Sequence, residues 1–490
     1  MIIKTNHDEI ENYFSDASNF RGDCEAVYFP ENKDEVSLIL KEANEKKTKV
    51  TVSGNGTGLA GARVPEGGIV IATDKLNKLI EINKEKMYAL AEPGILLSEF
   101  LATLKGMGLL YPPDPTEKNC YLGGTIATNA SGEKTFKYGP TRDYVTELEI
   151  VLADGEILNL KRGECIAENL ELILKTESGK AISIHLPDYK MPATKNAAGY
   201  YVKPGMDAID LFIGSEGTLG VITKIKLKLL PAPEKIISCI VFFPKEEDAL
   251  DFIQKGREAS YTSRAYNNIQ AIDALSLEYF DEKTLDFMRE DYSQIPGNSK
   301  AGVWFEQEVT HINEDFFLDE WMTLLQEFHG DEDSAWFAFT ESDKEKLQEF
   351  RHAIPEKIND FIAKNNVTKL GTDVAVPDNK FRELYNYSKK EVADSGLRYI
   401  IYGHFGNSHM HLNIMPVNSE EHLRGKSIYK SICKKAVDLG GTVSAEHGIG
   451  KMKTDYLVEM YGNSIVRKMA ELKRTLDPNK ILGAGNIFKL

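Results

Sequence analysis

The side chains of this chain that are best suited to chemistry are histidines gathered toward its C-terminal end. Five of its ten histidines fall within one stretch: His404, His409, His411, His422 and His447. The densest part reads YGHFGNSHMHLNIMP. If its second half is a strand, His409, His411 and Asn413 share one face, because strand side chains alternate. Imidazole is a common ligand of divalent metals, and Gly403 and Gly406 would let the backbone approach a ligand closely.

A carboxylate that could complete such a site lies downstream, in SAEHGIGKMK, where Glu446 and His447 precede two glycines. Two imidazoles and a carboxylate form a common set for a catalytic metal with an open position. The spacing of His404, His411 and Glu446 matches no short zinc motif, so hydrogen-bonded core residues stay open as an alternative. His422 follows two glutamates, and the sequence favours an ordinary surface role for it.

Glycine-rich loops in the first half of the chain indicate a second kind of site. The loop VSGNGTGLAG contains G-x-G-x-x-G, but a Rossmann fingerprint needs a long helix directly after it. Pro65 and the strand-like run Ile69–Ala72 follow instead, so this loop joins strand to strand. Three similar loops follow: NCYLGGTIATNASG, KYGPTRD and GSEGTLG. Four loops rich in backbone N–H groups predict an extended cradle for a phosphate and a ribityl chain.

The scaffold is predicted from hydrophobic periodicity and turn signals. The expected elements are a helix over 34–47, a strand over 49–52, a helix over 95–108, a hairpin over 149–158 and a strand over 221–230. Pro231 and Pro233 then mark a boundary. Beyond it, helical stretches such as ALDFIQKGREAS and DFFLDEWMTLLQEF alternate with short strands, which is typical of an α+β domain. We expect three parts: residues 1–233, 234–440 and 441–490.

Composition narrows the function classes. A length of 490 residues predicts two to four folding units, and a net charge of −16 disfavours nucleic acid as a partner. No apolar run is long enough to span a membrane, and the first residues do not resemble a signal peptide. We expect a cytoplasmic protein and leave peripheral contact with a membrane open. The five cysteines suggest neither a disulfide framework nor an iron–sulfur cluster, so any electrons must pass to a separate acceptor.

Eight motifs occur in order over nearly the whole chain: SGNGTG, GGTIATNASG, YGPTRD, KNAAGY, GSEGTLGVIT, GH-x-G…H-x-H-x-N, EHGIG and DPNKIL…N. Together they resemble the FAD-linked D-2-hydroxy acid dehydrogenases, which include D-lactate dehydrogenases, the flavin subunit of glycolate oxidase and D-2-hydroxyglutarate dehydrogenases. The resemblance implies an α+β protein of the vanillyl-alcohol oxidase and p-cresol methylhydroxylase fold. A two-subdomain FAD-binding domain would be followed by an α+β substrate and metal (cap) domain, and the C-terminal segment would pack back on the FAD domain.

By this resemblance the glycine-rich loops bind FAD, with residues 52–61 at the pyrophosphate and 214–222 on the adenosine side. The implied contacts are Ser53, Gly54, Asn55, Gly56, Thr57, Gly58, Pro113, Asp114, Gly123, Gly124, Ala127, Thr128, Asn129, Ser131, Gly132, Gly139, Arg142, Glu216, Gly217, Gly220, Ile222 and Asn486. Relatives that attach FAD covalently use a histidine in this region. The first two loops contain none, so the flavin is expected to be non-covalent.

The resemblance also implies a divalent metal (zinc, manganese or iron) bound by His404, His411 and Glu446. His447 would be the general base, and Asn413 would contact the substrate's C2 hydroxyl or carboxylate. Arg351, in EFRHAIPEK, would grip the C1 carboxylate. The implied reaction removes the hydroxyl proton to a base and passes the C2 hydride to flavin N5.

Two departures from the family pattern bear on metal and substrate. The family commonly reads G-H-x-G-D-G-N-x-H, whereas residues 407–409 here are Asn-Ser-His, so His409 is a further candidate ligand or the partner of one. Members that act on 2-hydroxyglutarate have a lysine two residues before the acid of a D-x-x-x-P stretch. Here Gly371 precedes Asp373, and Pro355 stands where those members have a threonine. D-lactate or glycolate is therefore favoured, although Lys369 lies close by.

Several alternatives stay open at this point. The chain could act on D-lactate, D-2-hydroxyglutarate or glycolate, or be an oxidase of the same fold that reduces dioxygen. A metal-dependent hydrolase or lyase whose loops bind no flavin is a third class. The expected partners are a small 2-hydroxy acid and an electron acceptor, which would be a quinone, an electron-transfer flavoprotein or an iron–sulfur subunit. A homodimer is one possible assembly.

Overall fold

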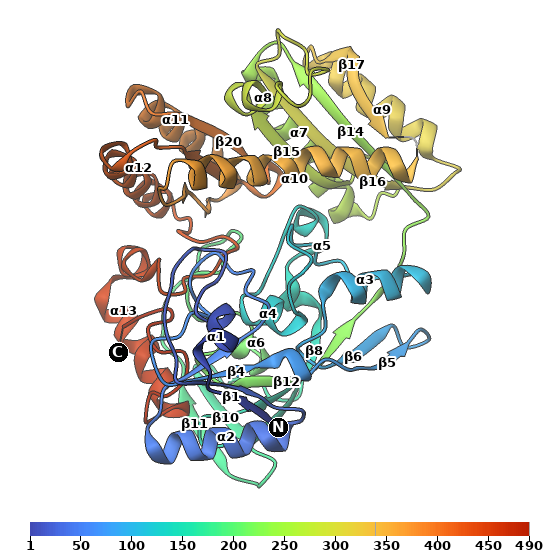
Figure 1. Cartoon of the computed structure of the whole chain (residues 1–490). Coiled ribbons are helices and arrows are strands. Elements are labelled where there is room, and N and C mark those ends of the chain that lie inside the picture. The colour runs from blue at the N-terminus through green and yellow to red at the C-terminus, as the bar shows by residue number, and fades with distance from the viewer. Residues whose placement is uncertain (339, 490) are drawn as a thin grey trace.

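The first glycine-rich loop joins one strand to the next, as its sequence predicts, and the two strands are parallel neighbours. The computed structural model of the chain describes residues 1–338 and 340–489 and has two lobes (Figure 1). In the first lobe, a four-stranded sheet has the order β1-β2-β4-β3, and β4 runs parallel to both β2 and β3. These strands are β1 (Ile2–Lys4), β2 (Ala26–Phe29), β3 (Val50–Ser53) and β4 (Ile69–Ala72). No long helix follows the glycines before β4, in agreement with the exclusion of a Rossmann site.

The helix predicted over residues 34–47 is confirmed as α2 (Lys33–Lys46). The Asn32 side chain caps its N-terminus by accepting a hydrogen bond from the backbone N–H of Glu35. Its buried residues include Val36, Ile39, Leu40 and Ala43, the face that the periodicity predicts. They pack against the four-stranded sheet and hold β3 in place beneath the first glycine-rich loop.

A second, antiparallel sheet completes the first lobe, in the order β5-β6-β12-β8-β9. Its strands are β5 (Leu79–Asn83), β6 (Tyr88–Ala91), β8 (Val145–Val151), β9 (Ile157–Lys161) and β12 (Val221–Lys228). The predicted hairpin is confirmed by the pairing of β8 with β9. The other α-helices and strands up to residue 233 are α1 (His7–Ile10), α3 (Leu97–Gly106), β7 (Leu109–Leu110), α4 (Leu122–Ala127), α5 (Thr135–Tyr138), β10 (Glu171–Lys175), β11 (Ala181–His185), α6 (Ile209–Phe212) and β13 (Leu230–Pro231).

The second lobe is built on one larger sheet, ordered β17-β14-β16-β15-β20-β21-β18, with β19 pairing to β21. Its strands are β14 (Lys235–Phe243), β15 (Ala274–Asp281), β16 (Ala301–Val309), β17 (Asp331–Ala338), β18 (Leu370–Gly371), β19 (Val374–Ala375), β20 (Tyr399–Gly403) and β21 (His409–Ile414). Its helices are α7 (Glu246–Tyr266), α8 (Glu282–Met288), α9 (Glu314–Glu327), α10 (Glu341–Lys364), α11 (Asp378–Asp394) and α12 (Ser419–Asp438).

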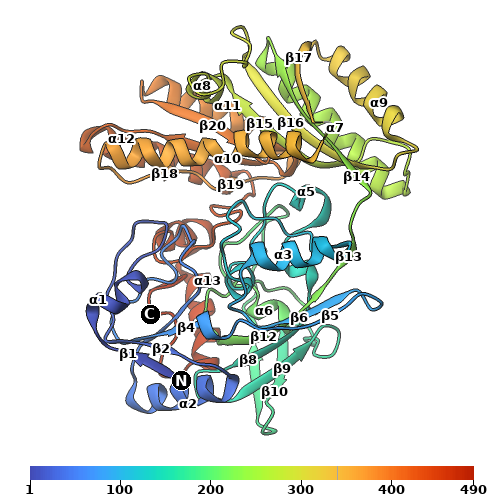
Figure 2. The same cartoon turned by 45° about the vertical axis from the view of Figure 1, so that its right-hand side comes forward.

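The two faces of this sheet have different roles. Residues of α7, α9, α11 and α12 share one core with one face of the sheet, whereas α8 and α10 form a separate core on the other. Because strand side chains alternate, burial of Met410 and Leu412 in the first core directs His409, His411 and Asn413 to the α10 side. In both views α10 crosses the side of the second lobe that faces the first lobe (Figure 2). The polar side chains of β21 therefore lie near the junction of the lobes.

The chain returns to the first lobe after α12, through α13 (Thr454–Leu476), as its place in Figure 1 shows. Leu482 forms a parallel bridge with Val50 on the free edge of β3. The Asn486 side chain donates a hydrogen bond to the backbone oxygen of Ala62 at 2.8 Å. The C-terminal segment therefore closes both the edge of the sheet and the back of the first glycine-rich loop.

The lobes are joined at α5. The ammonium of Lys137 lies 2.9 Å from carboxylate oxygens of both Asp273 and Glu308 in the second lobe. Arg264 of α7 donates to the backbone oxygen of Phe136 at 2.6 Å.

The five cysteines are free thiols, and four of them are buried. Among the described residues, no helix combines the length and apolar character that crossing a bilayer requires.

Candidate active site

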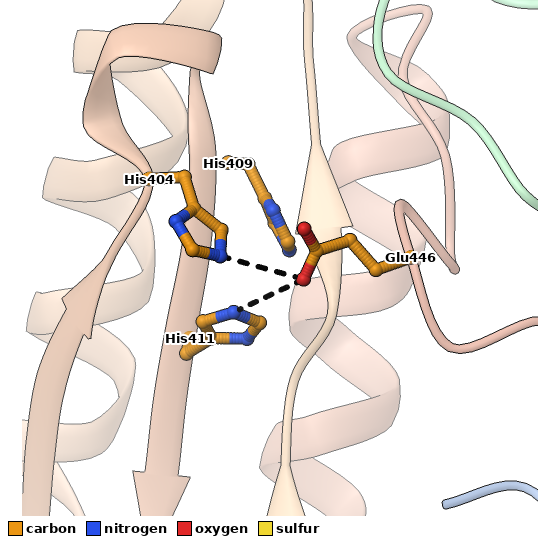
Figure 3. A group of neighbouring side chains, drawn as sticks. All are labelled: His404, His409, His411 and Glu446. Carbon is orange, nitrogen blue, oxygen red and sulfur yellow. Dashed lines mark ion pairs between the residues drawn. The ribbon is translucent and has the colours of Figure 1, made fainter. Parts of the chain in front are cut away.

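The histidines of the C-terminal half converge on one point. Strand β20 ends at Gly403, and the short 3-10 turn over residues 405–407 leads directly into β21. His404 is thereby placed beside His409 and His411, while Glu446 reaches the same point from the loop after α12 (Figure 3). The potential ligand atoms of these four residues lie within 4.8 Å of one another. The nearest carboxylate oxygen of Glu446 is 3.4 Å from Nε2 of His404 and 3.8 Å from Nε2 of His411.

Each imidazole is oriented by a partner outside the cluster. Nδ1 of His404 lies 2.6 Å from a carboxylate oxygen of Glu278, and Nδ1 of His411 lies 3.1 Å from the backbone oxygen of Thr372. Both residues therefore turn Nε2 toward Glu446, the arrangement in which outer partners orient metal-binding histidines. Nε2 of His409 lies 3.0 Å from Asp373, and its buried Nδ1 has no partner among the described residues.

The three imidazoles of the cluster differ in protonation state. Burial lowers the pKa of His409 to about 4. Burial and the neighbouring imidazoles hold the pKa of His411 well below its usual value. Burial would also lower the pKa of His404, but the carboxylates of Glu278 and Glu446 outweigh it and raise that pKa to about 9. At pH 7 the imidazoles of His409 and His411 are therefore neutral, whereas His404 carries a proton that a bound metal would displace. Two imidazoles with a carboxylate are a donor set that zinc and related metals take, so the residues present fit a divalent metal.

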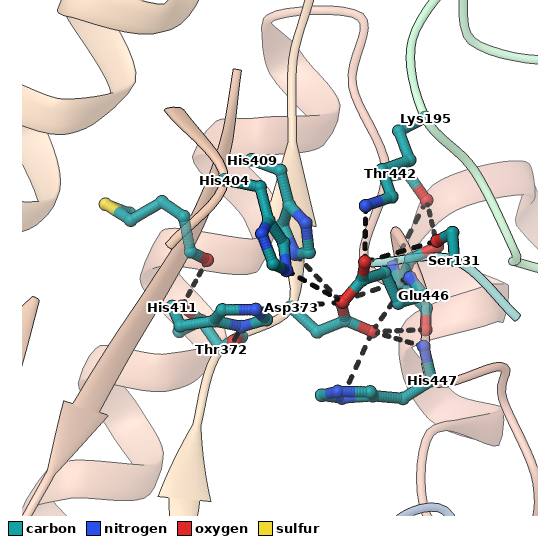
Figure 4. Close-up of polar contacts among 12 residues, drawn as sticks. Ser131, Lys195, Thr372, Asp373, His404, His409, His411, Thr442, Glu446 and His447 are labelled. Atoms are coloured by element: carbon teal, nitrogen blue, oxygen red, sulfur yellow. Dashed lines mark hydrogen bonds and ion pairs between the residues drawn. The ribbon is translucent and has the colours of Figure 1, made fainter. Parts of the chain in front are cut away.

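Asp373 organises the loop that carries Glu446 and His447 (Figure 4). It is fully buried between β18 and β19, and it accepts hydrogen bonds from the backbone N–H groups of Glu446 at 3.2 Å and His447 at 3.0 Å. Ser444 Oγ and Lys453 Nζ donate to it at 2.8 and 2.9 Å. Nδ1 of His447 lies 3.4 Å away. Burial lowers the pKa of His447 below its usual value, although Asp373 opposes this. The imidazole is therefore largely neutral at pH 7 and can accept a proton.

Arg351 of α10 and Asn413 of β21 lie on the same face of the sheet. The Nε of Arg351 donates to Glu278 at 3.0 Å, and its guanidinium lies over the Tyr402 ring, 4.8 Å from the centroid. Its two terminal NH2 groups have no acceptor among the described residues, which leaves the bidentate edge free for a carboxylate. The buried Nδ2 of Asn413 also has no partner within the described part of the chain. The structure thus provides unsatisfied donors on the side of the sheet that carries the histidine cluster.

Gly371 and Lys369 lie close to the side chain of Asn413. A Cβ atom on Gly371 would lie 2.6 Å from Oδ1 of Asn413 and 3.4 Å from Cε of Lys369, so a longer residue would displace Asn413. The Lys369 ammonium is 3.3 Å from Oδ1 of Asn359, and no carboxylate of the described residues forms an ion pair with it. Burial lowers the pKa of Lys369 to about 8. A cation without a carboxylate partner therefore stands close to Asn413.

The predicted flavin loops come together in the first lobe. Asn55 donates to the backbone of Asn119 at 2.5 Å, and the backbone N–H of Glu216 donates to Ala127 at 2.8 Å. The Asn486 side chain reaches the backbone oxygen of Glu216 at 3.1 Å. Within the described part of the chain, the backbone N–H groups of residues 54–59 have no hydrogen-bond acceptor. A row of free N–H groups in a glycine-rich loop is what a pyrophosphate needs, so these residues fit FAD.

Several side chains that the sequence places at the flavin form hydrogen bonds or ion pairs with other residues of the chain. Asp114 forms ion pairs with Lys134 at 2.5 Å and Lys118 at 2.9 Å. Arg142 pairs with Asp210 at 3.2 Å. Both carboxylate oxygens of Glu216 accept backbone N–H groups, from Ile449 and Gly450, at 2.7 Å. Ser131 Oγ donates to Glu446, in the histidine cluster, at 3.2 Å. These side chains shape and join the loops.

Three buried charges near the cluster received no role from the sequence: Glu278, Lys195 and Lys453. Glu278 could have been noticed as a charge inside the apolar strand ALSLEYF, a position where an ion needs a partner. Lys195 lies within KNAAGY, a motif that contributed to the resemblance without an assigned residue. For Lys453 the sequence carries no comparable signal, because its partner Asp373 is far away in the chain.

Comparison with known proteins identifies the class. Residues 24–161 match the family described as "FAD binding domain", and residues 232–487 match "FAD linked oxidases, C-terminal domain". Among solved structures, an alkyldihydroxyacetonephosphate synthase aligns with a TM-score of 0.68 at 17% identity, covering 98% of this chain and 81% of that one. A 4-ethylphenol oxidase from Gulosibacter chungangensis aligns with a TM-score of 0.69 at 16% identity, covering 99% and 94%. The fold is that of FAD-dependent oxidoreductases of the vanillyl-alcohol oxidase type, in agreement with the expected α+β class.

Sequence relatives identify the branch of that class. A D-lactate dehydrogenase of Anaerostipes hadrus is 31% identical over 93% of this chain and 88% of its own length. Glycolate oxidase subunit GlcD of Bacillus subtilis is 30% identical over 95% and 89%. A D-2-hydroxyglutarate dehydrogenase of Stutzerimonas stutzeri is 25% identical over 99% and 96%. The chain belongs to the FAD-linked D-2-hydroxy acid dehydrogenase family, which confirms the resemblance in its sequence.

Proposed function

We propose that this protein oxidises a small D-2-hydroxy acid, with D-lactate favoured, to the 2-oxo acid. The proposal rests on one observation. His404, His411 and Glu446 lie together beside a neutral His447, on the face of the sheet where Arg351 also lies. Residues 1–233 and 441–490 would form the flavin domain, and residues 234–440 the cap that supplies most of the polar groups. The flavin would be bound without a covalent link.

Each residue has a defined task in this reaction. The free edge of Arg351 binds the C1 carboxylate in a bidentate pair, and the unpaired Nδ2 of Asn413 donates to a substrate oxygen. His447 accepts the hydroxyl proton, while Asp373 holds the backbone of that loop and stabilises the imidazolium that results. When bound, FAD supplies the acceptor for the C2 hydride, and a metal at the histidine cluster polarises the hydroxyl.

The surroundings of Asn413 support a short substrate. The approach of Gly371 to Asn413 leaves no space for the lysine that would hold a second carboxylate at that position. D-lactate and glycolate need no such group, whereas D-2-hydroxyglutarate would have to use Lys369. We therefore place D-lactate first and keep glycolate and D-2-hydroxyglutarate as the alternatives.

The electrons would leave the reduced flavin for a separate acceptor: a quinone, an electron-transfer flavoprotein or an iron–sulfur subunit. We propose a cytoplasmic protein, with peripheral membrane contact and a homodimer as further hypotheses. Some relatives are named as mitochondrial D-lactate dehydrogenases, so the compartment is best determined by fractionation of the source cells. Rapid reoxidation of the reduced protein by air would favour the oxidase alternative.

The decisive experiment is an anaerobic titration of FAD- and metal-loaded protein, followed by the flavin absorbance. Rapid bleaching by D-lactate, with slow bleaching by L-lactate and D-2-hydroxyglutarate, is the expected result. Bleaching by D-2-hydroxyglutarate alone would overturn the substrate preference, and no bleaching by any of these acids or glycolate would overturn the proposed reaction. Protein that stays colourless after refolding with FAD would exclude both redox functions.

A further inference from the structure

The two oxygens of the Glu446 carboxylate face different parts of the molecule. Oε2 lies toward the histidines, 3.4 Å from His404 and 3.8 Å from His411. Oε1 points to the first lobe, where it accepts hydrogen bonds from the ammonium of Lys195 and from Ser131 Oγ, the latter at 3.2 Å (Figure 4). One oxygen is thus directed to the candidate metal centre, and the other is held by groups from the opposite lobe.

Lys195 is built into this position. Its side chain is only 5% exposed, its ammonium also lies 3.4 Å from the backbone oxygen of Gly132, and Glu446 is its ion-pair partner. The same loop is attached to the Glu446 segment twice more. Ala197 N–H donates to the backbone oxygen of Ser444 at 2.8 Å, and Thr442 Oγ1 donates to the side chain of Asn196 at 2.6 Å. Ordering a buried lysine at one carboxylate oxygen requires such support, because a free lysine loses side-chain entropy when it is fixed.

We propose that Lys195 is a positioning residue for the metal centre: it holds Oε1 of Glu446 so that only Oε2 is available as a ligand. This inference rests on the proposed function. A carboxylate held by one oxygen occupies one coordination position and leaves another for the substrate hydroxyl, which catalytic metal sites require. Partners that orient a ligand typically contribute 10- to 100-fold to metal affinity. Because Lys195 and Ser131 belong to the first lobe, the same contact fixes Glu446 relative to the glycine-rich loops that would bind the flavin.

The test is metal affinity, measured on FAD-loaded protein by competition with a chelator, with Zn2+ and Mn2+ as probes. Lys195→Met should weaken metal binding by about 10- to 100-fold. Lys195→Arg, which keeps a cation and a donor, should restore most of this loss. Lys190→Met removes a charge from an exposed position of the same loop and should leave the affinity unchanged. Ser131→Ala, a milder change that removes the second donor, should weaken binding by a few-fold and covers the case in which Lys195→Met does not fold.

The possible outcomes separate this inference from the proposed function. If wild type binds metal and Lys195→Met binds it equally well while keeping its flavin and melting temperature, the positioning role is wrong and the proposed function stands. Equal weakening by Lys190→Met would mean that loop charge, and not contact with Glu446, is responsible, and would also overturn the role. If the wild-type protein binds neither Zn2+ nor Mn2+, the metal part of the proposed function fails as well.

Discussion

Replacement of Glu278 by glutamine should reveal how strongly one buried carboxylate supports the candidate active site. Glu278 is completely buried and lies 2.6 Å from Nδ1 of His404 and 3.0 Å from Nε of Arg351. Burial raises its pKa, but His404 and Arg351 outweigh burial and bring the pKa to about 2. The carboxylate is therefore ionised at pH 7, and the neutral amide of Glu278→Gln cannot balance either cation.

The expected loss follows from these two contacts. A hydrogen bond to a charged group contributes about 1.5–3 kcal/mol, and removal of one partner of a buried ion pair costs about 3–5 kcal/mol. We expect Glu278→Gln to lower the free energy of unfolding by about 4 kcal/mol. For a domain of about 200 residues this corresponds to a decrease of about 8–16 °C in melting temperature. The metal-free protein is the right sample, because a bound metal would add its own stabilisation.

A matched control lies on the neighbouring strand. Glu306 is also buried, but burial raises its pKa, so the site already favours the neutral acid and Glu306→Gln should cost about 1 kcal/mol or less. Calorimetry of both variants at pH 7 makes the comparison. The free energy of unfolding of wild type should exceed that of Glu278→Gln, and this difference should begin to shrink as the pH falls below 4.5. A carboxyl group with a lowered pKa stabilises the fold only while it stays ionised. Equal melting temperatures for the two variants, or an unchanged Glu278→Gln protein, would refute this reasoning.

Three further predictions use other parts of the molecule. Burial raises the pKa of Asp281 from 3.8 to about 6, so its ionisation costs stability as the pH rises through 6. The free energy of unfolding of Asp281→Asn, measured by urea titration, should therefore increase relative to wild type by up to about 3 kcal/mol between pH 4 and 7. A difference between the two proteins that does not change with pH would contradict this prediction. A Cβ on Gly450 would lie 2.0 Å from the backbone oxygen of Ala60, so Gly450→Ala should lose most of its FAD on dialysis. Gly440→Ala, with a similar positive φ but open space, should keep it, and equal retention would exclude the packing argument. Lys369→Met should slow flavin reduction by D-2-hydroxyglutarate about tenfold and leave D-lactate unaffected; parallel changes for both acids would show that Lys369 does not distinguish them.

The parts of the fold that depend on local patterns could be predicted from the sequence. The periodicity of residues 34–47 predicts α2, and the proline after the first glycine-rich loop excludes a long helix there. Alternation along β21 places His409, His411 and Asn413 on one face because it depends only on the geometry of a single strand.

The partners of these residues could not be predicted in the same way. Glu278 meets His404 because β15 pairs with β20, and no local pattern encodes that pairing. Ser131 was expected at the flavin from its motif, yet its hydroxyl donates to Glu446 from a segment 315 residues away. A motif identifies which residues belong to a site, but long-range pairing determines which neighbour each one contacts.

The bridge between Val50 and Leu482 has a consequence for synthesis on the ribosome. The contacts that close β3 and the first glycine-rich loop join distant segments: the bridge pairs Val50 with Leu482, and the Asn486 side chain donates to the backbone oxygen of Ala62, 424 residues earlier in the chain. While the nascent chain grows, the edge of β3 stays open, and an open edge can pair with another chain. The strands of the first lobe are therefore translated before the second lobe, but their sheet is completed only after residues 482–486 have been translated.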